Sequence, residues 1–514
     1  MVPAGFRLRP DPGLMVRAGG TLLVGGSPLR LVKLSSAGAR QAAAWLDGQP
    51  VPDSEPARKL ARKLLDAGMA HPVLAPGTGP SLNDVTVVIP VMERPEELAR
   101  CLNGLAGLTV IVVDDGSADP EATERVAAAA GARALRHVTN KGPSAARNTG
   151  LAAVETGFVA FLDSDCVPEP GWLDHLLPHF TDPLVGAVAP RVVQHQAGGG
   201  WLARYEDVGS PLDMGPAPAI VRPGSPVSYV PTAALVVRRA AATTGFDAVM
   251  RVGEDVDFAW RLGDAGWRIR YEPQATMRHD HRVTLGPWLR RRMFYGTSAA
   301  DLEQRHPGSV RPLYMSPWTG AAWAAAVWRR PVTAIAITGV ACALFARKLR
   351  PVAGDEANEL AVRLAGGGTV LAARPIGRAL SRAWWPLAIP VALASRKLRL
   401  PLAALILLPP VLDWRGQEDP TLDAPRYISA RLLDDISYSV GVWWGCLRRR
   451  TIAPLLPTRS PVQSSNPDGT MMSSRDISVT EDLPSPYSVS LTPCRRISRT
   501  LVTPRSPAAA IPNR

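Results

Sequence analysis

The chain has 514 residues, enough for about two or three domains, and its 46% hydrophobic and 20% charged residues are typical of folded globular protein. Its 58 lysines and arginines against 45 aspartates and glutamates give a formal net charge of +13, which favours anionic partners such as nucleotides or phospholipid. No helix or loop pattern concentrates basic residues with aromatic ones between them, which makes nucleic acid the weaker choice of partner.

Two features of the sequence indicate a cytoplasmic working environment. The five cysteines have no paired spacing, as expected of reduced thiols rather than of a disulfide framework. The N-terminal segment MVPAGFRLRPDPGLMVRAGG lacks the apolar core of a signal peptide. We therefore expect the working part of the protein to face the cytoplasm.

Residues 1–78 are predicted to form a small α+β domain. TLLVGG and RLVKL have the composition of short strands, and turn residues separate them. Two helical patterns follow, AGARQAAAWLDG and PARKLARKLLDAG, and Gly68 ends the second. The stretch GTGPSLND, from Gly77 to Asp84, has the composition of a linker to the next domain.

Residues 79–312 alternate between strand and helix patterns. VTVVIPV, TVIVVDD and FVAFLDSD are continuous apolar runs rich in β-branched residues, as expected of strands that are covered on both faces. The stretches PEELARCLNGLAG and PSAARNTGLAAVE between them have helical patterns. This alternation predicts an α/β fold with a mostly parallel, twisted sheet, whose ligands bind at the carboxyl ends of the strands.

Two aspartates follow the third of these strands. Asp163 and Asp165 are separated by one residue, and their carboxylates would repel each other unless a cation lay between them. Hard carboxylate oxygens suit Mg²⁺ or Mn²⁺, and such an ion can bind a diphosphate. Acidic residues are also common in turns, so these two aspartates alone are a weak signal.

Further polar residues stand near the ends of neighbouring elements. Asp114 and Asp115 end the second strand, where they can contact a nucleobase or a ribose hydroxyl, although an Asp-Gly turn is the simpler explanation. Lys141 and Arg147 surround the start of a helix, which suits a phosphate group; without these neighbours Arg147 would be read as a surface charge.

A cluster of acids begins a later helix. Glu254, Asp255 and Asp257 can act as helix-capping residues, or one of them can face the cleft and accept a proton from an attacking hydroxyl. Farther along, His279 and His281 can serve as a metal ligand or a diphosphate contact, or can be structural histidines. Spacing alone does not choose between the two imidazoles.

Residues 313–457 contain apolar stretches at 331–346, 383–395, 400–412 and 436–447, with tryptophans and basic residues beside them. This pattern is typical of a membrane interface, although the longest charge-free run is shorter than the ~20 residues that span a bilayer. We therefore expect membrane-associated helices, with a soluble helical domain as the alternative. Residues 458–514 are predicted to be disordered.

Five of these segments, in this order, resemble the inverting family 2 glycosyltransferases of GT-A fold: IPVMERPEEL, VVDDGS, NKGPSAARNTG, FLDSD and GEDVDFAWRL. The resemblance implies a nucleotide-sugar donor and a divalent metal ion, Mg²⁺ or Mn²⁺. It places Pro90, Glu93, Asp114 and Asp115 at the nucleotide, Lys141 and Arg147 near the diphosphate, Asp163 and Asp165 at the metal, and Asp255 as the base. The Q-x-x-R-W signature of polymer-forming members is missing; WLRRRMFYG stands in its region.

The N-terminal unit resembles small winged-helix-like peptide-recognition domains. Together with the catalytic motifs, it makes the chain similar to the glycosyltransferases of the mycofactocin system of actinobacteria. This resemblance implies transfer of glucose, from UDP-glucose, to the peptide-derived redox cofactor premycofactocin. The alternatives are a transferase that acts on a lipid-linked or cell-envelope acceptor and a non-catalytic peptide-binding adaptor. The oligomeric state is not predicted.

Overall fold

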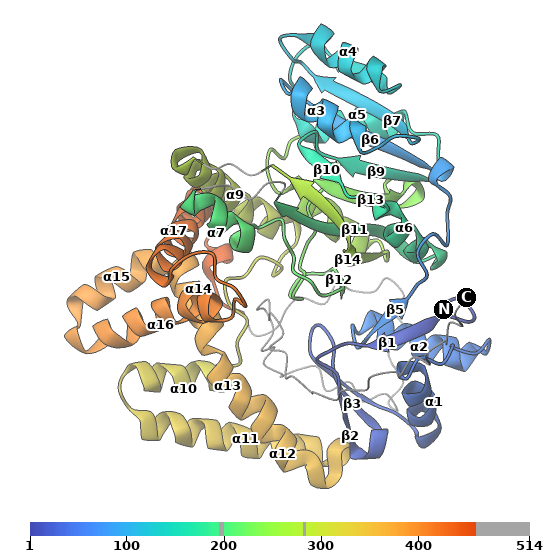
Figure 1. Cartoon of the computed structure of the whole chain (residues 1–514). Helices are drawn as coiled ribbons and strands as arrows, with labels where there is room; N and C mark the ends of the chain where they lie inside the picture. The colour runs from blue at the N-terminus through green and yellow to red at the C-terminus, as the bar shows by residue number, and fades with distance from the viewer. Residues whose placement is uncertain (195–199, 281–283, 459–514) are drawn as a thin grey trace, which may run out of the picture.

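The computed structural model describes residues 1–194, 200–280 and 284–458 (Figure 1). A large sheet with helices forms one part of the molecule, the N-terminal unit lies below it, and the C-terminal helices extend to one side (Figure 1). His281, Cys494 and the predicted disordered tail from residue 459 onward lie outside the described residues.

The N-terminal unit has the α+β composition predicted from the sequence. Its elements are β1 (Arg7–Pro10), β2 (Met15–Arg17), β3 (Leu22–Gly25), β4 (Arg30–Lys33), α1 (Ser36–Leu46), α2 (Glu55–Asp66) and β5 (Ala70–Val73). Strands β2, β3 and β4 form one antiparallel sheet, and β1 pairs with β5. The Ser35 hydroxyl caps α1 by accepting a hydrogen bond from the Gly38 N–H.

This unit is attached firmly to the rest of the protein. The Arg62 guanidinium lies 2.6 Å from the Asp182 carboxylate, and Arg268 lies 2.8 Å from Asp66; the first of these pairs is buried. One face of the β2–β3–β4 sheet packs against residues of the C-terminal helices through Leu22 and Leu349. The N-terminal unit therefore contacts both other parts of the chain.

The first half of the large sheet is parallel. It contains β6 (Val85–Val91), β7 (Thr109–Asp115), β8 (Arg133–His137) and β9 (Phe158–Leu162), with helices α3 (Pro95–Asn103), α4 (Pro120–Ala129) and α5 (Pro143–Ala152) between them. Strand β6 pairs in parallel with both β7 and β9, and β7 pairs with β8. Because β6, β7 and β9 run side by side in one direction, their carboxyl ends lie at one edge of the sheet.

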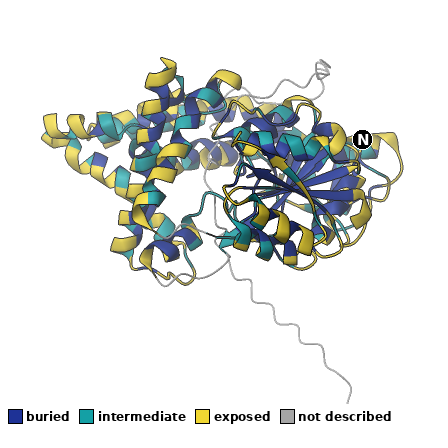
Figure 2. Cartoon of the chain, turned by 90° about the horizontal axis from the view of Figure 1, so that it is seen from above, coloured by how far each residue is buried: buried dark blue, intermediate teal, exposed yellow. Residues whose placement is uncertain are grey.

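The second half makes the sheet mixed rather than mostly parallel. Its elements are β10 (Cys166–Pro168), α6 (Trp172–Leu176), β11 (Val185–Gln194), α7 (Trp201–Gly209), β12 (Ala219–Ile220), β13 (Ala234–Arg238), α8 (Glu254–Asp264), β14 (Arg268–His279) and α9 (Leu285–Arg305). The strand order is β10-β14-β11-β13-β9-β6-β7-β8, and β13 pairs antiparallel with both β9 and β11. The sheet is buried between its covering helices (Figure 2). The α/β fold class is confirmed, with this change to the sheet.

The C-terminal region is helical. Its helices are α10 (Pro317–Val327), α11 (Pro331–Ala353), α12 (Ala357–Ala361), α13 (Gly367–Leu371), α14 (Ala373–Arg382), α15 (Trp385–Ala394), α16 (Arg396–Arg415) and α17 (Ala424–Arg449). Helix α17 lies against α9, with glycines at the crossing: a Cβ added at Gly441 would lie 1.9 Å from the Met293 carbonyl oxygen. The apolar stretch 436–447 therefore packs against α9 by one face, while Trp444 and Leu447 on this stretch are exposed.

The other apolar stretches are more exposed. Helices α10 and α11 form one hairpin and α15 and α16 another, and both extend to the same side (Figure 1). Within the described residues one helical stretch, Pro331–Arg382, is long and apolar enough to cross a membrane, and 11% of its most apolar window is buried. The tryptophans do not all face outward, since the indole N–H groups of Trp323, Trp384 and Trp443 donate to backbone carbonyls.

Candidate active site

The strand-end aspartates lie where the sequence predicts, at the carboxyl end of β9. Asp163 follows the last residue of β9, and its backbone N–H donates to the Ala233 carbonyl oxygen at 3.0 Å. Its side chain is 30% exposed, so one carboxylate face remains accessible. Asp165 is two residues farther, directly before β10. The backbone turn between the two strands thus presents both carboxylates at one edge of the sheet.

Arg147 joins this edge to the start of helix α8. Its Nη2 atom donates to Asp163 Oδ1 at 2.7 Å, and its Nη1 atom donates to Glu254 Oε1 at 3.2 Å. The side chain is buried, and burial lowers the pKa of Arg147, but the two carboxylates outweigh burial and raise it above its usual value. The guanidinium therefore stays charged and holds the two acidic motifs together instead of pointing toward solvent.

Asp255, the predicted base, follows Glu254 in the first turn of α8. Its Oδ1 atom accepts a hydrogen bond from the Val256 N–H at 2.8 Å. Burial and the neighbouring Glu254 carboxylate raise the pKa of Asp255 to about 7. A carboxylate with this pKa can accept a proton near neutral pH. Two other charges act on the same pKa, since Arg147 lowers the pKa of Asp255 and Asp163 raises it.

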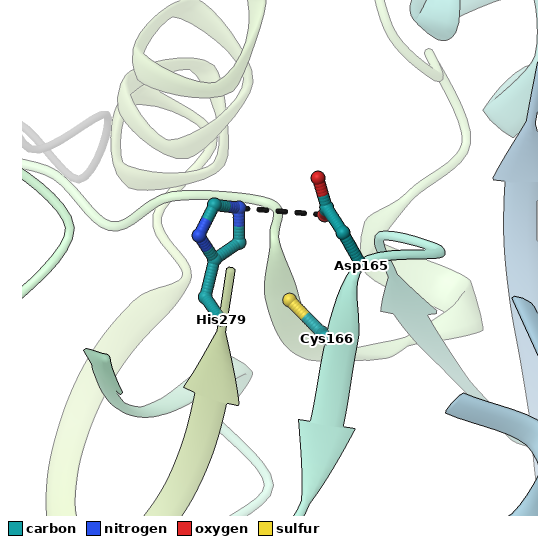
Figure 3. A group of neighbouring side chains, drawn as sticks. All are labelled: Asp165, Cys166 and His279. Carbon is teal, nitrogen blue, oxygen red and sulfur yellow. Dashed lines mark ion pairs between the residues drawn. The ribbon is translucent and has the colours of Figure 1, made fainter. Parts of the chain in front are cut away.

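Asp165 and His279 form a potential metal site (Figure 3). His279 ends β14, directly opposite Cys166 of β10, and its Nε2 atom lies 3.3 Å from Asp165 Oδ1. Burial raises the pKa of Asp165, but its His279 and Arg94 partners outweigh burial and hold the pKa below its usual value. Arg94 contacts Asp165 Oδ2, so its cationic group already compensates this carboxylate.

The chemistry of this donor set fits a divalent cation. One carboxylate and one imidazole are donors that Mn²⁺ and similar ions accept. Candidate ligand atoms of Asp165, Cys166 and His279 lie within 4.8 Å of one another. Burial raises the pKa of Cys166 well above its usual value, so its thiol stays protonated and is a poor ligand. Asp165 and His279 are therefore the candidate ligands in this group. Asp163, the other predicted ligand, is paired with Arg147, and His281 lies outside the described residues.

The two aspartates at the end of β7 have different surroundings. Both carboxylate oxygens of Asp115 accept hydrogen bonds. Oδ1 accepts them from the Lys141 N–H and from His137, and Oδ2 accepts one from the Gly142 N–H. Asp114 Oδ1 accepts from Ser117, whereas Asp114 Oδ2 is buried without a hydrogen-bond partner among the described residues. Arg136 Nε lies 3.9 Å from Asp114 Oδ2, beyond hydrogen-bonding distance, so this oxygen can still accept a hydrogen bond from a ligand, while Asp115 holds the loop that precedes α5.

The remaining predicted residues lie around this loop. Glu93 Oε1 accepts from the Ala118 N–H at 2.6 Å, and its own N–H donates to the Ser117 hydroxyl, so Glu93 links β6 to the loop after β7. Pro90 is half-buried within β6. Lys141 has an exposed side chain. These residues surround the end of β7, but Arg147 points away from them, toward Asp163 and Glu254.

A cavity of about 230 Å³ opens beside Asp165. Its lining includes Arg94, Asp165, His279, Arg291 and Tyr295. Sequence analysis did not assign roles to Arg94, Arg291 or Tyr295. Arg94 lies within the segment IPVMERPEEL, two residues before the glutamates that begin the helix. Nothing in this local pattern indicates that Arg94 would contact Asp165. Asp165 and His279 both line this cavity.

Comparison with known proteins identifies the family. The profile of Glycosyl transferase family 2 matches residues 86–244. A pre-mycofactocin glycosyltransferase from Mycobacterium tuberculosis is 44% identical over 466 residues, which cover 89% of this chain and 98% of that protein. The chain belongs to the pre-mycofactocin glycosyltransferase family. It is therefore a glycosyltransferase, as the sequence predicts.

More distant similarities are restricted to part of this glycosyltransferase. The glycosyltransferase AglE of Haloferax volcanii is 32% identical over 142 residues, covering 25% of this chain and 46% of that protein. Among solved structures, a mannosyltransferase from Pyrobaculum calidifontis in complex with GDP-Man and Mn²⁺ is 20% identical, with a TM-score of 0.35, over 53% of this chain and 77% of that chain.

Proposed function

We propose that this glycosyltransferase moves glucose from UDP-glucose, with inversion, onto a hydroxyl group of premycofactocin. The main support is the ion-paired cluster of Arg147, Asp163 and Glu254, which gathers the strand-end acids and the start of α8 around one edge of the sheet. The acceptor is inferred from the relative that shares most of this chain, since that protein is named for pre-mycofactocin.

Each side chain has a distinct role in the proposed reaction. Asp114 Oδ2, which is buried and has no hydrogen-bond partner among the described residues, accepts a hydrogen bond from the nucleobase. Asp165 and His279 would hold Mg²⁺ or Mn²⁺, and Asp163 is the further predicted ligand; when bound, the ion would neutralise charge on the departing diphosphate. Because an imidazole is a softer donor than a carboxylate, it favours Mn²⁺ over Mg²⁺. Pro90, Glu93 and Lys141 border the nucleotide.

Asp255 removes the proton from the acceptor hydroxyl as this oxygen attacks the sugar. Its raised pKa of about 7 makes the carboxylate a stronger base than an ordinary aspartate while leaving a large ionised fraction at neutral pH. A single attack opposite the leaving diphosphate inverts the anomeric carbon and needs no covalent enzyme intermediate. Arg147 is a positioning residue in this scheme, because it holds Asp163 and Glu254 in place.

The test is a transfer assay with the full-length protein. We expect UDP-glucose, Mn²⁺ and premycofactocin together to yield UDP and a β-linked glucosylated product, whose linkage is read from its NMR coupling constant. Asp255→Asn should lower the rate by about two to four orders of magnitude, whereas Asp264→Asn, on the same helix, should leave it unchanged. UDP release only with a lipid extract would favour a lipid-linked acceptor, and no turnover with either would favour the adaptor.

The exposed hairpins support a location of this enzyme at a membrane surface. Val332, Leu393 and Leu400 are 79%, 69% and 78% exposed near the hairpin ends, and basic residues stand beside them, including Arg329 and Lys397. Apolar groups flanked by cations suit anionic lipid headgroups. The catalytic sheet would then lie on the cytoplasmic side. Co-sedimentation with phosphatidylglycerol vesicles, and its loss in Leu393→Asp/Leu400→Asp, would support this location; absence of vesicle binding would refute it.

A further inference from the structure

Arg382, at the end of α14, is held by α17 in an unusual environment. Its Cζ atom lies 3.9 Å from the centre of the Tyr438 ring, and its Nη1 atom lies 3.3 Å from Asp435 Oδ1. The Asp435 side chain is 3% exposed, but that of Arg382 is 39% exposed. The guanidinium is therefore fixed on one side and open on the other.

The charge of Asp435 is shared among several partners. Besides Arg382, it contacts Arg431 at 3.6 Å and accepts a hydrogen bond from the Ser381 hydroxyl at 2.7 Å. Among the described residues, the Arg382 side chain donates its hydrogen bond to Asp435. A guanidinium has five N–H donors, so Arg382 retains donors for a ligand.

Close helix contacts connect this arginine to the catalytic base. A Cβ added at Gly296 of α9 would lie 2.0 Å from the Tyr438 carbonyl oxygen of α17, so the two backbones touch at this residue. One added at Gly253, which directly precedes Glu254 and Asp255, would lie 2.8 Å from the Ser298 Cβ of α9. Helix α9 thus contacts both Tyr438 and the start of the helix that carries Asp255.

Two further tyrosines complete the connection. Tyr295 of α9 lines the cavity that contains Asp165, and the Tyr229 hydroxyl donates to the carbonyl oxygen of Pro211, which lines the same cavity. Burial raises the pKa of Tyr229; Asp255 also raises it, whereas Arg382 lowers it. Tyr229 therefore lies within electrostatic range of both the catalytic base and Arg382.

We propose that Arg382, stacked on Tyr438, binds the acceptor beside Asp255, donating hydrogen bonds to a carbonyl or carboxylate oxygen of the acceptor. This inference rests on the proposed function, because it assigns the acceptor side of that same site. It gives the C-terminal helices a direct role in acceptor selection. In this scheme the base that acts on the acceptor comes from α8, whereas Arg382 and Tyr438, which bind it, come from α14 and α17.

The chemistry of the two residues suits this role. The planar guanidinium is held by the Tyr438 ring through a cation–π contact, which limits its motion and lowers the entropic cost of binding. A hydrogen bond to a charged group contributes about 1.5–3 kcal/mol, equivalent to roughly a 10- to 100-fold change in affinity. Loss of Arg382 should therefore weaken acceptor binding by this factor without changing the donor site.

The test compares Arg382→Gln, Arg382→Lys and a control, Arg363→Gln, which removes an exposed arginine from the C-terminal region. We expect Arg382→Gln to raise the KM for premycofactocin about 10- to 100-fold, with Arg382→Lys intermediate. The KM for UDP-glucose should match that of the unmodified protein, and so should the rate of any UDP release measured without acceptor. An unchanged acceptor KM, or an equal loss of acceptor-independent UDP release, would overturn the proposal.

Direct binding separates this proposal from the proposed function. Premycofactocin is titrated into the full-length protein and into Arg382→Gln by calorimetry, in the presence of UDP. If the unmodified protein binds the compound without glucosylating it, the proposed function fails, and the affinity of Arg382→Gln still decides the role of Arg382. Equal affinity in the two proteins, or no binding to the unmodified protein, would overturn the assignment of Arg382.

Discussion

Arg147 lies between two carboxylates that come from distant parts of the chain. It reaches Asp163 Oδ1 at 2.7 Å and Glu254 Oε1 at 3.2 Å from within a buried environment. Helix α5, the end of β9 and the start of α8 are therefore tied together by one guanidinium. This arrangement keeps Asp255, the next residue after Glu254, near the strand-end acids.

Replacing Arg147 with methionine should destabilise the protein and impair catalysis. Removal of one member of a buried ion-paired group leaves charge uncompensated, at a cost of about 3–5 kcal/mol. Because Asp163 is 30% exposed, we expect the lower end of that range. Urea denaturation measures the loss. Arg136→Met, which removes an exposed arginine 3.9 Å from Asp114, is the control and should change stability by less than about 1 kcal/mol. Equal stability of Arg147→Met and the unmodified protein would contradict the bridging role.

The activity should depend on the ionisation of Asp255. Its carboxyl must be deprotonated to act as a base, and its pKa is about 7, so kcat/KM should rise with pH through about 7 and level off above it. The groups coupled to it electrostatically are Glu254, Arg147 and Asp163, with Tyr229 and Tyr295 on other elements. The measurement is a pH profile of kcat/KM at saturating Mn²⁺.

A second variant tests the cause of this pKa. Glu254→Gln removes the negative neighbour that helps to raise the pKa of Asp255, so the rise in kcat/KM should move to lower pH. A profile that is flat between pH 5 and 8 in the unmodified protein, or that stays in place in Glu254→Gln, would show that another group limits the reaction.

Metal binding can be measured independently of turnover. We expect Asp165→Asn and His279→Ala each to weaken Mn²⁺ binding by more than about tenfold, since each removes a candidate donor. Asp280→Asn is a matched control, because Asp280 follows His279 and lines the same cavity but is paired with Arg100. Electron paramagnetic resonance of free Mn²⁺ gives the affinity. If Asp280→Asn weakened Mn²⁺ binding as strongly as Asp165→Asn, the loss would reflect the general negative charge of the cavity, and Asp165 and His279 would not be specific ligands.

The strands that carry the site were predictable because each is a continuous apolar run followed by polar residues. The segments VTVVIPV and TVIVVDD match β6 and β7 residue for residue. Asp163, Asp165 and Asp255 could be selected because acids at strand or helix ends leave a local pattern. The antiparallel pairing of β13 had no such signal, since pairing direction depends on connections between residues far apart in sequence.

The contribution of the C-terminal helices was not predictable from local pattern. Arg382 and Tyr438 are separated by more than fifty residues, and only the packing of α14 on α17 brings them together. The flanking tryptophans favoured a membrane interface, but several of them donate hydrogen bonds inside the protein. An indole at the end of an apolar helix satisfies either environment, so its position in the sequence does not separate them.

The glycine contact between α9 and α17 should control both stability and acceptor binding. A Cβ at Gly296 would lie 2.0 Å from the Tyr438 carbonyl oxygen, so Gly296→Ala must push the helices apart. We expect a loss of about 1–3 kcal/mol, measured by urea denaturation, and a raised KM for the acceptor as Tyr438 moves. Gly286→Ala, in the same helix with open space around it, should be neutral or stabilising. If both variants behaved alike, the close crossing would not determine the position of Tyr438.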